Sequence, residues 1–69
     1  MKFLLVVVMC SSVMQVCTPE MRLDYYDSWF DCSSAGYLAA FEFNQNLGKS
    51  RVDAEKILVN FKCEMVGTI

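Results

Sequence analysis

The fold of this chain depends on the stretch Lys2-Phe-Leu-Leu-Val-Val-Val-Met-Cys10. This stretch can be interpreted either as a secretory signal or as a strand of the folded domain. A secretory signal has a basic start, an apolar stretch of about 7 to 15 residues and small residues before the cleavage point. Lys2 and the apolar run after it supply the first two features, but no Ala-x-Ala sequence follows. The β-branched residues Val6-Val-Val8 favour a strand instead.

The other end of the chain supports the strand interpretation. Apolar and polar residues alternate from Val59 to Val66, which is typical of a half-buried strand. A single strand needs a neighbour to satisfy its backbone hydrogen bonds, and Val6-Val-Val8 is the strongest candidate elsewhere in the chain. We therefore expect residues 1–69 to form one small domain that keeps its first strand. The alternative is a signal peptide, residues 1–12 or 1–17, that is cleaved from a mature domain.

Between these two segments, the sequence predicts a hairpin and a polar connection. Ser11-Ser12 would form the tip of the hairpin, and Val13 to Cys17 would return as a second strand. Pro19 would end this pairing, because proline has no amide hydrogen to donate to a neighbouring strand. Residues 20–26 are then expected to connect the hairpin to a helix.

Capping residues mark the limits of that helix. Asp27 or Ser28 can begin it, and Gly48 is well placed to end it. One face would carry mostly small or apolar residues that can approach a sheet closely: Cys32, Gly36, Ala39, Ala40, Phe43 and Leu47. A second capping pattern at Ser50 predicts a short helical turn over residues 51–56, before the last strand.

These elements predict an α+β fold. It would contain a small single-layer sheet, in the order strand, strand, helix, strand, with one main helix packed on one face. A right-handed crossover makes the second and third strands parallel, and the first strand lies between them, antiparallel to both. This arrangement places Cys32 near Cys17 and Cys63, whereas Cys10 falls at the opposite end.

The four cysteines are therefore expected to form one disulfide or none. A disulfide requires Cα atoms within about 7 Å of each other, so Cys32 would bond Cys17 or Cys63, and Cys10 would have no partner. Structural zinc sites usually use close cysteine pairs, often with histidine. The chain has no histidine, and no two cysteines are closer in sequence than Cys10 and Cys17. We expect no metal and no other cofactor.

Catalysis is not expected either. Asp24, Asp27 and Asp31 could suggest a carboxylate site, but acidic residues are favoured at a helix start in any case. No catalytic residue can be assigned without a recognisable nucleophile and base. Nucleic acid is an improbable partner, because the aromatic residues lie in the acidic half of the chain. A membrane span needs roughly 20 consecutive apolar residues, and polar residues interrupt the first run.

One aromatic cluster is a candidate interface. Four of the nine aromatic residues fall within six positions, namely Tyr25, Tyr26, Trp29 and Phe30. Aromatic side chains are common at the centres of protein interfaces. The alternative is that they close one end of a very small core, which needs every large apolar group that the chain contains.

Several short motifs resemble those of small uncharacterised proteins from marine bacteriophages. They are Asp31-Cys-Ser-Ser-Ala-Gly-Tyr37, Val59-Asn-Phe-Lys-Cys63 and the apolar segment that ends at Cys10. The resemblance implies a compact accessory protein made in the cytoplasm of an infected host cell, which is a reducing compartment. It implies no functional residues.

The sequence thus predicts a non-enzymatic accessory protein that acts through protein–protein interaction. Its partner would be an unidentified protein, for example one of the host, or a second copy bound through a free strand edge. The alternative is a secreted or envelope-associated mini-protein stabilised by disulfides, with an N-terminal signal peptide.

Overall fold

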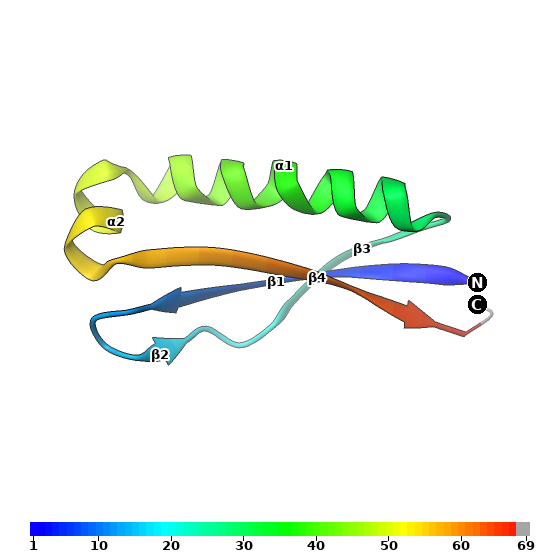
Figure 1. The fold of residues 1–69 in the computed structure, drawn as a ribbon, viewed down its shortest axis with the longest axis horizontal. Helices are drawn as coiled ribbons and strands as arrows, with labels where there is room; N and C mark the ends of the chain where they lie inside the picture. Colours follow the sequence, from blue (N-terminus) through cyan, green and yellow to red (C-terminus); the bar gives the residue numbers. More distant parts are fainter. Residues whose placement is uncertain (68–69) are drawn as a thin grey trace.

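The computed structural model describes residues 1–67 as a four-stranded antiparallel sheet with one long helix on one face (Figure 1). The α+β class, the single sheet and the one main helix that the sequence predicted are therefore confirmed. The elements are β1 (Lys2–Ser11), β2 (Val16–Cys17), β3 (Met21–Tyr26), α1 (Trp29–Leu47), α2 (Lys49–Glu55) and β4 (Ile57–Val66).

Strand β1 lies at the centre of the sheet. On one side it pairs with β4 along its whole length, from Lys2 opposite Val66 to Ser11 opposite Ile57. On the other side it pairs first with β2 and then with β3. All of these pairings are antiparallel, so the three outer strands run in one direction and the central strand runs in the other.

The prediction for residues 20–26 was wrong, because most of this segment is strand β3 and not a connection. Its register shifts at a bulge opposite Leu5 and Val6. A bulge adds a residue and interrupts strict alternation, so the sequence pattern concealed the strand. The predicted second strand is correspondingly shorter: residues 12–15 form the turn, and only Val16 and Cys17 pair.

The helix boundaries follow the capping residues. Ser28 is the N-cap, and its hydroxyl oxygen accepts a hydrogen bond of 3.0 Å from the backbone N–H of Asp31. At the other end, Gly48 has a φ angle of 88°, which only glycine adopts without strain. Helix α2 follows at once and covers most of the helical turn predicted at 51–56.

The core lies between α1 and the sheet. Leu5 and Val7 of β1 and Cys32 of α1 are fully buried there, and partly buried side chains from β3, β4 and α1 pack around them. On the opposite face of the sheet no helix lies over β1, yet Leu4 and Val6 are also buried. Lys62 lies opposite Val6 in β4, and its ion pair with Glu20 crosses β1 on this face.

Two disulfides fix the ends of this arrangement. Cys32 bonds Cys63 and ties α1 to β4, which is one of the two pairings that the sequence left open. The expectation that Cys10 has no partner was wrong, because Cys10 bonds Cys17. The hairpin explains this pairing: with a turn at residues 12–15, Cys17 lies directly opposite Cys10 instead of at the far end of a long second strand.

Gly36 sets how closely α1 approaches the sheet. A methyl group at this position would overlap the aromatic ring of Phe61 in β4. The absence of a side chain therefore lets the phenyl ring lie directly beneath the helix.

We expect Gly36→Ala to destabilise the domain by about 1–3 kcal/mol, because the ring of Phe61 must move. Alanine is otherwise a better helix residue than glycine by about 1 kcal/mol. Equilibrium unfolding in urea measures the difference. Ser34→Ala, on the exposed side of the same helix, is the control and should cost little. A more stable Gly36→Ala protein would contradict the close approach.

Candidate protein-interaction surface

The four aromatic residues predicted as an interface do not form one surface. Tyr26 packs against the core, whereas Tyr25, its neighbour in the strand, projects to the other face. Trp29 meets Phe3 edge to face, with 5.8 Å between the ring centres. Phe30 is 75% exposed on the outer side of α1. The structure thus divides the cluster between one core residue, Tyr26, and three exposed positions, because Trp29 is also 55% exposed.

The three aspartates near the helix start also have separate roles. Asp27 forms an ion pair with Lys2, which holds the pKa of this carboxyl below its usual value through a hydrogen bond. Asp24 accepts a hydrogen bond from the backbone N–H of Tyr25. Asp31 lies in the first turn of α1, where acidic residues are favourable. Within residues 1–67, no cluster of three acidic or cysteine residues could hold a metal ion.

A different set of apolar residues is exposed along α1. Phe30, Tyr37 and Phe41 are 62–75% exposed and are spaced seven and four residues apart, so they share one side of the helix. None of the three belongs to the helix face that the sequence predicted to approach the sheet. They lie outward because the side of α1 that faces the sheet is occupied mainly by small residues. Their helical spacing was the signal that could have revealed this stripe.

This stripe continues onto β4. The ring of Tyr37 meets that of Phe61 edge to face, with 4.9 Å between the ring centres. Further along β4, Met65 is 69% exposed. We call these five residues the α1–β4 surface: Phe30, Tyr37 and Phe41 from the helix, and Phe61 and Met65 from the strand.

The outer edge of β4 borders this surface and is unpaired among the described residues. Its ten residues pair with β1 without a bulge and include no proline. The opposite edge of the sheet is different, because it is divided into two short strands by a segment that contains Pro19 and is bent by a bulge. An unpaired strand edge exposes backbone donors and acceptors that can pair with another strand.

The charges on β4 lie on the face away from α1. The ammonium of Lys62 is 2.7 Å from a carboxylate oxygen of Glu20 and 3.4 Å from one of Glu64. The hydrogen bond from Lys62 holds the pKa of Glu20 below its ordinary value of 4.5. The same bond raises the pKa of Lys62 above 10.5.

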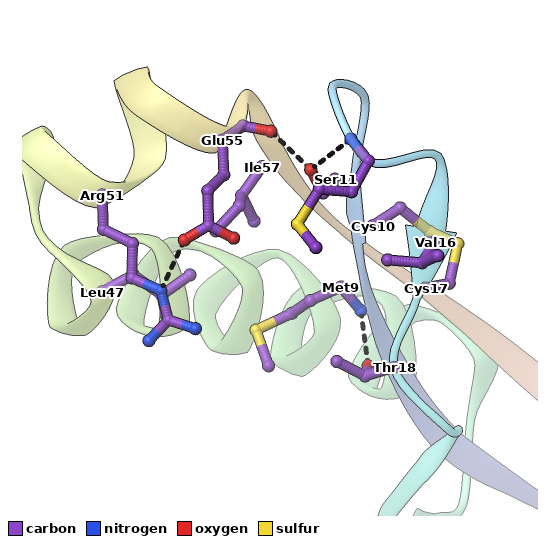
Figure 2. Close-up of a pocket in the computed structure, with 11 residues that line it drawn as sticks. Met9, Cys10, Ser11, Val16, Cys17, Thr18, Leu47, Arg51, Glu55 and Ile57 are labelled. Carbon is purple, nitrogen blue, oxygen red and sulfur yellow. Dashed lines mark hydrogen bonds and ion pairs between the residues drawn. A yellow bond between two sulfur atoms is a disulfide. The ribbon is translucent and has the colours of Figure 1, made fainter.

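An apolar recess lies at the opposite end of the molecule from Lys2, beside the hairpin. Figure 2 shows it between the Cys10–Cys17 disulfide, the end of α1 and helix α2. Its volume is about 230 Å³, below the range of roughly 300–1,000 Å³ typical of small-molecule sites. Its two charged side chains, Arg51 and Glu55, form an ion pair with each other. The hydroxyl of Ser11 donates to the backbone carbonyl of Glu55. The ion pair thus lies within α2, and the Ser11 hydrogen bond holds the hairpin against this helix.

Comparisons with protein-family models, curated proteins and solved structures find no match to this chain. No helix in the described part of the chain is long and apolar enough to cross a membrane.

The Glu20–Lys62 ion pair predicts a pH dependence of stability. The carboxylate of Glu20 has a lowered pKa in the folded state, so the unfolded chain binds more protons as the pH falls below 4.5. The stabilisation is therefore present above pH 4.5 and is lost as the pH falls through the lowered pKa. We expect Glu20→Gln to reduce the melting temperature at pH 7. At a pH below the lowered pKa of Glu20, the substitution should leave the melting temperature almost unchanged.

Thermal melts of both proteins across the pH range measure this difference. Glu42→Gln is the matched control, because Glu42 forms no ion pair among the described residues. An effect of Glu20→Gln that stays constant with pH would show that the ion pair does not contribute to stability.

Proposed function

We propose that this chain is a non-enzymatic binding protein whose partner is another protein, docked on the α1–β4 surface. The observation that carries the proposal is the outward stripe of Phe30, Tyr37 and Phe41. Contiguous exposed apolar residues on a small domain commonly mark interaction sites. Aromatic side chains on a helix held by a disulfide also lose little conformational freedom on binding.

The remaining surface supports binding over catalysis. The recess beside the hairpin is small, and its charged side chains are paired with each other. The chain has no histidine that could serve as a general base near neutral pH. The interface originally predicted at Tyr25, Tyr26, Trp29 and Phe30 contributes only Phe30 to this proposal.

A crosslinking experiment tests the surface. A photoreactive benzoylphenylalanine in place of Tyr37 is expected to give a discrete crosslinked protein product in the cells that produce this chain. The same group in place of Glu42, which is also exposed, should give little product, because it lies on a different side of the helix. Equal crosslinking at both positions, or none at Tyr37, would contradict the assignment.

A second proposal concerns the compartment. All four cysteines are in disulfides, and disulfides persist mainly in oxidising environments. They favour a secreted or envelope location over the reducing cytoplasm implied by the phage resemblance. This fold nevertheless requires residues 2–11, because β2, β3 and β4 all pair with β1. We therefore propose that the functional form keeps β1 and has both disulfides closed.

Intact mass of the protein from its natural source, after alkylation without reduction, checks this second proposal. We expect a mass that includes β1 and carries no alkyl group, and four alkyl groups when reduction comes first. Alkylation of all four cysteines without reduction would favour the reducing cytoplasm. A chain that begins after residue 12 or 17 would show that the mature protein has a different fold.

A further inference from the structure

We infer that the partner bound at the α1–β4 surface is a second copy of this chain, paired edge to edge through antiparallel β4 strands. The inference rests on the proposed binding function and adds the identity of the partner. The twofold axis would pass through Cys63, so residues 60–66 of the two copies would pair. The sheet would become continuous across the dimer.

The β4 edge has the properties that such pairing needs. It is ten residues long, regular, and free of proline and bulges. Strand edges in monomeric proteins are usually protected by charges, bulges or short length. The opposite edge of this sheet has a bulge and short strands, but β4 has only the charged residues Lys62 and Glu64. A strand that pairs with this edge must therefore place opposite charges across from Lys62 and Glu64.

A twofold axis at Cys63 makes the two charges complementary. In antiparallel pairing about this residue, Lys62 of each copy lies opposite Glu64 of the other, and opposite charges at such positions stabilise a strand pair. The same register places Phe61 opposite Met65 on the face that carries α1. An axis at residue 62 or 64 would instead place identical charges opposite each other. An axis at Phe61 would place Glu64 opposite Leu58 and give Lys62 no carboxylate.

The pairing also brings the starts of the two α1 helices together. Helix α1 packs over both β1 and β4 (Figure 1). Adjacent strands lie about 4.8 Å apart, so the two α1 axes would be separated by about 10 Å, close to the spacing of packed helices. Tyr37 contacts Phe61 and therefore lies on the side of α1 toward β4. Because Cys32 is bonded to Cys63 at the axis, only the first turns of the two helices lie side by side, and Phe30 of one copy would approach Tyr37 of the other. Phe41 lies nine residues, or about 13 Å, beyond Cys32 along α1 and away from the axis.

Charge exchange tests both the partner and the register. The wild-type protein is expected to sediment as a dimer. Glu64→Lys alone and Lys62→Glu alone each place like charges opposite each other and should weaken dimerisation by about tenfold or more. An equimolar mixture of the two variants restores opposite charges at both positions. It should yield a dimer with one chain of each kind, which native mass spectrometry identifies by its mass.

Two further variants keep the test independent of folding. Asp53→Asn removes an ion pair within α2 but leaves Lys62, Glu64 and the β4 edge unchanged, so its dimer affinity should equal that of the wild type. Lys62→Glu combined with Glu64→Lys in one chain exchanges the charges and should form a dimer again. Circular dichroism melts establish that each variant is folded before sedimentation.

The outcomes separate this inference from the proposed function. A wild-type monomer at several hundred micromolar, or a dimer that is insensitive to both single charge changes, would overturn the β4 pairing about Cys63. If the wild-type monomer still crosslinks through position 37 to a different protein, the binding function stands and only the identity of the partner is wrong. If the self-pairing is right, the product at position 37 has twice the mass of the chain.

Discussion

The backbone of β1 is the constraint on which the rest of this structure depends. A strand at the centre of a sheet needs hydrogen-bonding partners along both edges, and in this chain β4 supplies one edge while β2 and β3 divide the other. No outer strand pairs with another outer strand in the described residues. Of the five apolar residues that are buried in the described part of the chain, four therefore belong to β1: Leu4, Leu5, Val6 and Val7.

The close contact between α1 and the sheet explains why the helix exposes its aromatic residues. Gly36 lies over the ring of Phe61, and Cys32 reaches Cys63 through a disulfide. Small side chains on this side of the helix bring its backbone near β4. At Gly36 there is no room for a side chain, while Phe30, Tyr37 and Phe41 project outward, so the same helix both packs on the sheet and forms the apolar surface.

The sequence predicted those features of the fold that depend on local patterns. Alternation in β4 and the capping residues Ser28 and Gly48 identified the strand and the helix limits. Features that depend on spatial pairing were missed. The bulge concealed β3, and the short hairpin placed Cys17 opposite Cys10 in a way that the sequence did not suggest. The α1–β4 surface was missed because it combines a helical stripe with a strand distant in sequence.

The pairing of β1 with β4 also has a consequence for how the chain folds. It joins the first and last strands, so the contacts that complete the sheet have nearly the largest separation in sequence that the chain allows. Folding rates fall as the average sequence separation of contacts rises. During synthesis, the apolar β1 segment leaves the ribosome well before β4, its full-length partner. The nascent chain must therefore carry an apolar strand with one unpaired edge until β4 has been made, and during that interval chaperones and targeting factors that recognise apolar segments can compete with folding.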